Sequence, residues 1–259
     1  MESEFKGASV LVTGGARGIG RAIALAFAGR GASVAIIYAK NDGAAALTVE
    51  EIARRGGAGL AVRCDVRDPG AVDAAVAQAE ARHGGIRILV NSAGCVRDSL
   101  MTSMQDEDWR AVIDTNLSGA FHCMRAVAEG MVLRRSGRII NVSSLAGERG
   151  GRGQANYAAS KGGIVALSKT LARELGKFGV TVNVLAPGMV LTELTRRLPP
   201  DVLEKAMDET VTGARRYRIT CHHRIDPGQW RRLVLQALDQ RFHLLDCTAD
   251  FDLDATRIV

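Results

Sequence analysis

Short apolar runs alternate with longer, alanine-rich amphipathic stretches through the first two-thirds of the chain. The apolar runs predict buried strands at 8–13, 33–38, 59–64, 86–91, 138–143 and 180–186. The stretches between them predict helices at 18–29, 43–55, 71–82, 109–134 and 157–176, with a glycine-rich loop up to 153 and a further helical pattern at 229–245. Strand–helix alternation favours parallel strands with right-handed crossovers. We therefore expect an α/β fold, a doubly wound parallel sheet of Rossmann type, as a single domain over residues 1–259.

A glycine-rich segment lies directly between the first predicted strand and the first predicted helix. It reads Thr13-Gly-Gly-Ala-Arg-Gly-Ile-Gly20, a Gly-x-x-x-Gly-x-Gly spacing that differs from Gly-x-Gly-x-x-Gly. Glycines let the backbone approach a pyrophosphate, and the helix N-terminus supplies amide donors. A plain strand-to-helix turn is the alternative, but three glycines in this place favour a dinucleotide loop. The expected cofactor contacts here are Gly14, Arg17, Gly18, Ile19 and Gly20.

The end of the second predicted strand bears on the choice of dinucleotide. An NAD-binding protein usually places an acidic residue there to hold the ribose 2′-hydroxyl. This chain has Tyr38, with Lys40 two residues on and Arg17 in the glycine loop. Two cations and no acid favour a 2′-phosphate, so we expect NADP(H). The alternative for Lys40 is an ordinary solvated lysine.

The third and fourth predicted strands end in residues that suit the rest of a dinucleotide. Asp65, which precedes Val66, can accept a hydrogen bond from an adenine amino group. The small residues of Asn91-Ser-Ala-Gly94 let the backbone pass close to a cofactor. Each segment also fits a simple turn. The expected contacts here are Asp65, Val66, Asn91, Ala93 and Gly94.

Tyr157 and Lys161 carry the candidate chemistry. They lie one helical turn apart, so their side chains share one face of a helix. A fixed ammonium favours phenolate, so we expect Lys161 to lower the pKa of Tyr157. Such a tyrosine can exchange a proton near neutral pH, as carbonyl reduction requires.

Charge and composition narrow the class of protein. The net charge is +6 and aromatic residues are only 4% of the chain, with no dense basic run interleaved with aromatics, so a nucleic-acid partner is not expected. The apolar runs are too short to span a membrane. The five cysteines are scattered without metal-like spacing, which predicts no metal site and reduced thiols in a cytoplasm.

Several motifs occur in order and together resemble the short-chain dehydrogenase/reductase family, most closely its 3-oxoacyl-[acyl-carrier-protein] reductase group. The resemblance covers about residues 8–212. Ser92 stands where the family usually has asparagine. The motifs are the glycine loop, Asn91-Ser-Ala-Gly94, Asp114-Thr-Asn-Leu117, Gly137-Arg-Ile-Ile-Asn-Val-Ser-Ser144, Gln154-Ala-Asn-Tyr-Ala-Ala-Ser-Lys161 and Val182-Asn-Val-Leu-Ala-Pro-Gly188.

The resemblance implies a role for each matching residue. Tyr157 would protonate the substrate carbonyl, Lys161 would lower its pKa and hold the nicotinamide ribose, and Ser144 would hydrogen-bond the carbonyl. Asn116 would hold a water in a proton relay to Lys161. The residues implied to lie along the nicotinamide are Pro187, Gly188, Val190 and Thr192.

The implied reaction is reduction by NADPH of a 3-oxoacyl thioester, in fatty-acid or polyketide synthesis. A reductase for acyl-CoA thioesters, or an alcohol, sugar or steroid dehydrogenase, is the nearby alternative. The alternative of another class is a non-catalytic dinucleotide-binding protein or an inactive product with an altered C-terminus. Arg134, Arg135 and Lys177 form a candidate docking patch for an acidic acyl carrier protein, and solvated helix-end charges are the alternative.

The resemblance stops after Gly213, so residues 214–259 form an atypical C-terminal segment. Two explanations stay open: a lineage-specific tail, or a shifted reading frame, which the coding DNA would reveal by a downstream frame encoding the family's Asp-Gly-Gly ending. The family's last strand fills the sheet edge and helps to build a tetramer, so its loss would expose backbone donors. We expect a homo-oligomer, a tetramer or dimer, if this segment folds.

Overall fold

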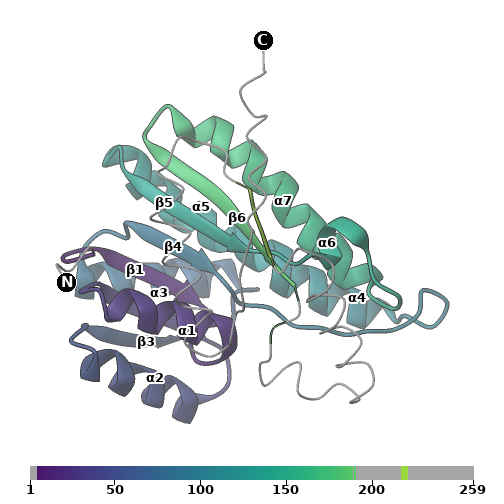
Figure 1. Cartoon of the computed structure of the whole chain (residues 1–259), viewed down its shortest axis with the longest axis horizontal. Helices are drawn as coiled ribbons and strands as arrows, with labels where there is room; N and C mark the ends of the chain where they lie inside the picture. The colour runs from purple at the N-terminus through teal and green to yellow at the C-terminus, as the bar shows by residue number, and fades with distance from the viewer. Residues whose placement is uncertain (1–4, 189, 191–216, 221–259) are drawn as a thin grey trace.

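Figure 1 shows the protein as a computed structural model, which describes residues 5–188, 190 and 217–220. The described strands form a single sheet in the order β3-β2-β1-β4-β5-β6-β7. The first six are parallel, and β7 runs antiparallel to β6. The strands are β1 (Ser9–Thr13), β2 (Ser33–Tyr38), β3 (Gly59–Arg63), β4 (Ile88–Asn91), β5 (Gly137–Val142), β6 (Val180–Pro187) and β7 (Tyr217–Thr220).

Helices connect consecutive parallel strands, as the sequence predicted. Two of them begin at side-chain caps: Asn41 accepts from the Ala44 amide before α2, and Asp68 accepts from two amides of the first turn of α3. Among the described helices, none combines the length and apolarity needed to cross a membrane. The helices are α1 (Gly18–Ala28), α2 (Asp42–Arg54), α3 (Pro69–His83), α4 (Asp106–Ile113), η1 (Asp114–Ser118), α5 (Gly119–Leu133), α6 (Ala146–Arg149) and α7 (Ala155–Gly176).

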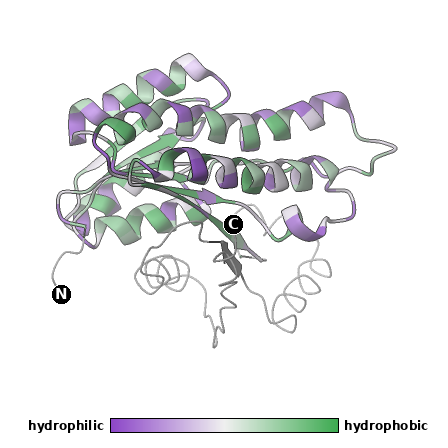
Figure 2. Cartoon of the chain, turned by 90° about the horizontal axis from the view of Figure 1, so that it is seen from above, coloured by the Kyte–Doolittle hydropathy of each residue, from purple (hydrophilic) through white to green (hydrophobic). Residues whose placement is uncertain are grey.

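The core lies on both faces of the sheet, because successive side chains of a strand point to opposite faces. Val10 and Val12 of β1 pack in a cluster with residues of α1, whereas Leu11 packs in a second cluster with residues of α3 and α5. The strands are therefore apolar almost throughout, while the helices alternate apolar and polar positions (Figure 2). This pattern is typical of a parallel sheet covered on both faces.

The chain reverses direction across the sheet between β1 and β4. From β1 it winds outward through β2 to β3, and then returns to the other side of β1 for β4, β5 and β6. A crevice opens outside the carboxyl ends of the strands at such a switch point, which is where this fold binds ligands. The glycine loop after β1 and the segment after β4 flank this point.

Three details differ from the sequence prediction. The expected long helix at 109–134 begins at Asp106 and contains a π-helical turn, Asp114–Ser118, and the expected loop before Gly153 contains the short helix α6. No strand was predicted beyond 186, yet β7 pairs with β6 from Val184 to Pro187 and supplies hydrogen-bond partners at that edge. The predicted helix at 229–245 lies outside the described residues.

Candidate active site

The glycine loop is held close to the segment that follows β4. A Cβ atom at Gly20 would lie 2.4 Å from the carbonyl oxygen of Gly14, so only glycine allows α1 to begin this near the loop. Gly14 has φ +67° and also packs against Ala93, where a Cβ would lie 2.9 Å from Cα. Ile19 and Gly18 open α1, and Arg17 is its exposed N-cap. The loop thus presents main-chain amides at the switch point.

The ends of β2 and β3 bring polar side chains to the same edge. Tyr38 donates through its hydroxyl to Asp42 at 2.9 Å, and Lys40 is exposed one residue beyond Ala39. Asp65 accepts from the Arg67 guanidinium at 2.6 to 3.0 Å, and this hydrogen bond lowers the pKa of the Asp65 carboxyl. The carboxylate proposed for adenine therefore already has an arginine partner.

Hydrogen bonds from neighbouring strands hold the segment that follows β4. The Thr13 hydroxyl accepts from the amides of Ser92 and Ala93 at 3.1 and 3.0 Å. The Asn91 side chain is buried and donates to Asn141 on β5 at 2.8 Å. Asn91 therefore uses its side chain to join two strands, and the main chain from Ser92 onward remains at the edge.

Asn116 lies in the π turn and joins three parts of the chain. Its Oδ1 accepts from the Cys95 amide at 2.8 Å, and its Nδ2 donates to the Cys95 carbonyl and to Ser160 Oγ on α7, both at 3.1 Å. Gly94 is adjacent, since a Cβ there would lie 3.2 Å from Asn116 Oδ1 and 3.9 Å from Lys161 Nζ. The π turn thus places Asn116 beside Lys161.

The two serines after β5 have different surroundings. Ser143 is buried and donates to the main-chain carbonyl of Lys161 at 2.9 Å. Ser144 forms a hydrogen bond with the Tyr157 hydroxyl that favours the phenolate, and its Oγ accepts from the Ala146 amide at the start of α6. The second serine is therefore the one that faces the tyrosine.

Tyr157 and Lys161 both lie on α7 beside this serine. The Lys161 ammonium lies 5.6 Å from the centre of the Tyr157 ring and donates to the Val142 carbonyl at 2.8 Å. Lys161 is only 5% exposed, and this burial lowers its pKa to about 8. The ammonium is therefore directed at the end of β5 rather than at the phenol oxygen.

The expected lowering of the Tyr157 pKa by Lys161 is wrong. Burial raises the pKa of Tyr157, and the hydrogen bond from Ser144 only partly opposes this change. Desolvation disfavours both charged forms, the phenolate and the ammonium. At neutral pH Tyr157 accordingly carries its proton, which is the form that can donate it.

The residues after β6 complete the edge. Pro187 ends the strand and its carbonyl accepts from the Leu145 amide at 3.2 Å, so the β5 and β6 ends are tied together. Gly188 and Val190 follow at the same edge. Val66 lies three residues after β3, and its carbonyl forms a hydrogen bond with the His122 ring at 3.0 Å. Thr192 lies outside the described residues.

The candidate docking patch lies elsewhere. Arg134 and Arg135 follow α5, Lys177 follows α7, and both segments precede the amino ends of β5 and β6. The Arg135 guanidinium donates to the Lys177 carbonyl at 3.2 Å, and Arg134 donates to the Ile86 carbonyl at 2.8 Å. The Arg135 side chain thus contacts the Lys177 main chain, whereas Arg134 also pairs with Glu80 at 3.9 Å, and both arginines lie at the opposite edge of the sheet from Tyr157.

The sequence did not single out three residues that support the site. Ser160 receives the Asn116 amide and donates to the Tyr157 carbonyl at 2.7 Å. Asn156 is fully buried, accepts from the Tyr157 amide and donates to the Arg97 carbonyl at 2.9 Å. Cys95 supplies both main-chain partners of Asn116. Their positions within or directly after the quoted motifs were the available signal.

A dinucleotide loop and a proton-donating tyrosine at one edge of a doubly wound sheet define the class of protein: a dehydrogenase or reductase that works with a nicotinamide cofactor. The family model described as short chain dehydrogenase matches residues 8–203. The chain belongs to this family.

The most similar relatives share one name. A 3-oxoacyl-[acyl-carrier-protein] reductase of Synechocystis is 47% identical over 188 residues, which are 73% of this chain and 76% of that protein. The corresponding Escherichia coli reductase is 45% identical over 197 residues, 76% of this chain and 79% of that one. The crystal structure of a Brucella melitensis reductase of the same name has a TM-score of 0.74 at 37% identity, covering 79% of this chain and 77% of that one.

Proposed function

We propose that the protein reduces 3-oxoacyl thioesters to 3-hydroxyacyl thioesters with NADPH. The observation that carries the proposal is the hydrogen-bonded pair Ser144 and Tyr157, with Lys161 beside the tyrosine ring on α7. The relatives named above are 3-oxoacyl-[acyl-carrier-protein] reductases, and they cover most of the chain. The geometry of the site and the similarity to these relatives support the same reaction.

Each residue has a role that its surroundings permit. A bound NADPH supplies the hydride. Tyr157 donates its proton to the carbonyl oxygen as the hydroxyl group forms, and Ser144 donates a hydrogen bond to the same oxygen. Lys161 would hold the nicotinamide ribose and return a proton towards Tyr157. Both amide hydrogens of Asn116 are used, so its main-chain carbonyl in the π turn would hold the relay water.

The raised pKa of Tyr157 is compatible with its proposed role as proton donor. Burial raises the Tyr157 pKa, so the phenol is protonated at neutral pH. Reduction of a ketone consumes that proton, whereas oxidation of an alcohol needs the phenolate. The protonated phenol is therefore the form that ketone reduction uses.

The proposed cofactor is NADP(H) rather than NAD(H). Tyr38 occupies the strand end where an acid would hold a ribose 2′-hydroxyl, and Arg17 and Lys40 are exposed on the neighbouring loops. The remaining proposed contacts are main-chain or small groups at the same edge: Gly14, Gly18, Ile19, Gly20, Val66, Asn91, Ala93, Gly94, Pro187, Gly188 and Val190.

The proposed macromolecular partners are an acidic acyl carrier protein and further copies of this chain. The cluster of Arg134, Arg135 and Lys177 offers positive charge to a carrier. On α5, Phe121 is 40% and Leu133 is 76% exposed, and such side chains suit an interface between copies, in a dimer or tetramer. The free thiols of the described chain fit a reducing cytoplasm.

Oxidation of NADPH, followed by absorbance with acetoacetyl thioesters of carrier protein and of coenzyme A, tests the proposal. We expect turnover with both and a lower KM for the carrier. Tyr157→Phe should reduce kcat about 10²- to 10⁴-fold while NADPH still binds, since the phenyl ring preserves packing and removes the proton. Turnover only with simple ketones, or an active Tyr157→Phe variant, would contradict the proposal.

A further inference from the structure

Arg63 occupies a position at the cofactor edge that the sequence motifs do not reveal. It is the last residue of β3 and pairs in register with Tyr38, the last residue of β2. Neighbouring strands lie about 4.8 Å apart. Arg63 therefore stands beside the place where an acidic residue would select NAD.

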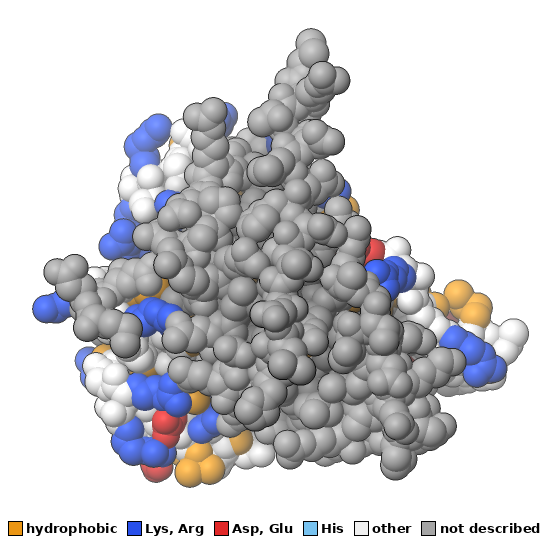
Figure 3. Space-filling view, viewed as in Figure 1, with side chains coloured by type: hydrophobic (Ala, Val, Ile, Leu, Met, Phe, Trp, Pro, Cys, Tyr) orange, Lys and Arg blue, Asp and Glu red, His pale blue; other side chains and the backbone are white. Residues whose placement is uncertain are grey.

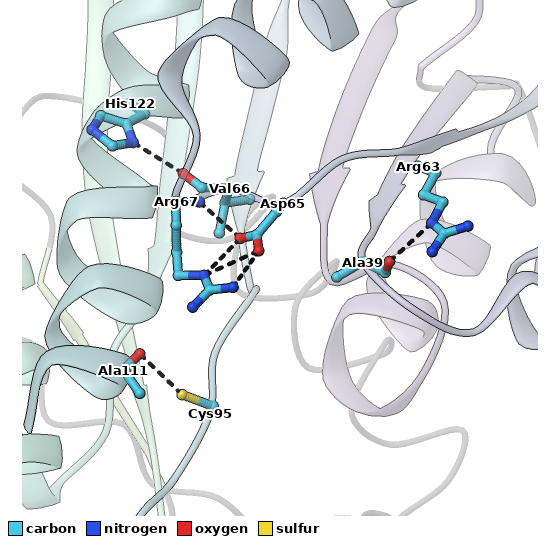
Figure 4. A network of polar contacts seen from close by, with 8 residues as sticks. All are labelled: Ala39, Arg63, Asp65, Val66, Arg67, Cys95, Ala111 and His122. Carbon is cyan, nitrogen blue, oxygen red and sulfur yellow. Dashed lines mark hydrogen bonds and ion pairs between the residues drawn. The ribbon is translucent and has the colours of Figure 1, made fainter. Parts of the chain in front are cut away.

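A hydrogen bond directs the Arg63 side chain towards the loop after β2. Its Nε donates to the Ala39 carbonyl at 3.3 Å, and Ala39 lies between Tyr38 and Lys40 (Figure 4). Arg63 is exposed, and among the described residues its two terminal nitrogens have no hydrogen-bond partner. The guanidinium is thus held by one nitrogen and offers the other two to a ligand.

The nearby acids do not neutralise this guanidinium. Both carboxylate oxygens of Asp65 accept hydrogen bonds from Arg67, as Figure 4 shows. Asp42 accepts the Tyr38 hydroxyl, and that bond raises the pKa of Tyr38 while the Arg63 charge partly opposes the rise. Arg63 therefore acts on the Tyr38 phenol without being paired to a carboxylate.

Positive charge from three strand ends surrounds this point. Arg17 follows β1, Lys40 follows β2 and Arg63 ends β3. Basic side chains are also visible in the lower left of the space-filling view, on the side where Figure 1 shows β3 and α2 (Figure 3). These strands are neighbours in the sheet, so all three cations would attract a dianionic group bound at their carboxyl ends.

We propose that Arg63 is a specificity-determining residue that binds the 2′-phosphate of NADP(H) through its two terminal nitrogens. This inference rests on the proposed NADP(H) preference. The planar guanidinium matches two phosphate oxygens at once, which a lysine ammonium does not. Arg67 carries the same group four residues on, but its Nε and one terminal nitrogen already donate to Asp65.

The test compares the dissociation constants of NADPH and NADH for the wild type, Arg63→Gln and a charge-matched control. Arg82→Gln serves as the control because Arg82 is exposed in the last turn of α3, away from the carboxyl edge. We expect Arg63→Gln to weaken NADPH binding about tenfold, as loss of one charge-assisted phosphate contact would. NADH binding should stay within about twofold, which also shows that the variant folds.

Each outcome has a distinct meaning. A wild type that prefers NADPH, with the same preference in Arg63→Gln, would overturn the role of Arg63 and leave the proposed cofactor intact. A wild type that binds both dinucleotides equally would overturn the cofactor preference together with this inference. Adenosine 2′-monophosphate, used as a competitor of NADPH, should lose affinity in Arg63→Gln but not in Arg82→Gln.

Discussion

At the amino ends of β4, β5 and β6, arginine side chains donate hydrogen bonds to main-chain carbonyls. Arg134 bonds to Ile86, and Arg138 bonds to Gly179 at 3.0 Å. At the carboxyl ends of the sheet, Ser144 faces Tyr157, and Arg63 keeps two nitrogens for a ligand. Polar residues are abundant at both edges, so abundance alone does not mark a site. What distinguishes the carboxyl edge is a pair of hydrogen-bonded hydroxyl groups, Ser144 and Tyr157, beside a buried lysine.

The largest difference is expected for the two serines after β5. Ser144→Ala should lower kcat about 10²- to 10³-fold, because the carbonyl loses a hydrogen bond that strengthens as charge develops on its oxygen. Ser143→Ala removes only the contact with the Lys161 carbonyl and should instead lower the free energy of unfolding by about 1 kcal/mol. Steady-state kinetics and chemical denaturation of both variants measure the contrast. Equal kinetic losses would show that the pair acts as a unit.

The buried ammonium should limit activity at high pH. Since the Lys161 pKa is lowered to about 8 and the Tyr157 pKa is raised, the lysine loses its proton first as pH rises. We expect kcat/KM for ketone reduction to fall about tenfold per pH unit above roughly pH 8. A decline that begins only above pH 10 would assign the limb to Tyr157 instead, because its pKa is raised above that ordinary value.

Protein stability over the same interval provides an independent check. The unfolded chain keeps Lys161 protonated up to its ordinary pKa of 10.5, whereas the folded chain releases the proton near 8. The unfolded state thus binds more protons between these values, and the Lys161 contribution to the free energy of unfolding should rise with pH. In Lys161→Met this contribution should disappear.

The smallest effect is expected at the amino edge. Arg134→Met removes the donor to the Ile86 carbonyl and should lower the free energy of unfolding by about 1 kcal/mol, with kcat/KM for a coenzyme A thioester unchanged. Arg82→Met, an exposed arginine in the last turn of α3, is the control and should change neither quantity. A large loss of turnover in Arg134→Met would remove the distinction between the two edges.

Local pattern was sufficient to predict most of the fold. The strand expected at 33–38 is β2 residue for residue, and the six predicted strands all occur in the parallel part of the sheet. The π turn was not predictable in this way, because Asn116 is held there by Cys95 and by Ser160, 21 and 44 residues away in the chain. Likewise β7 is a short segment defined by its pairing with β6 rather than by a recognisable pattern of its own.

The site shows the same division. Spacing placed Tyr157 and Lys161 on one helical face, but it could not reveal that the ammonium turns towards the Val142 carbonyl. The spacing therefore correctly predicted that Tyr157 and Lys161 are neighbours, but the predicted direction of the Tyr157 pKa shift was wrong. The position of Arg63 at the cofactor edge was missed because Arg63 belongs to no motif. Only the register of β3 against β2 shows that it lies beside Tyr38.

The clamp formed by Asn116 has a consequence for how such a protein can diversify. One side chain joins the end of the β4 segment and α7 to the π turn, whereas the exposed turn at 100–104 forms hydrogen bonds mainly within itself. Mutations, insertions and deletions in that turn can then accumulate while the catalytic groups keep their places. A lineage built on this scaffold can explore new substrates while its reaction is inherited unchanged.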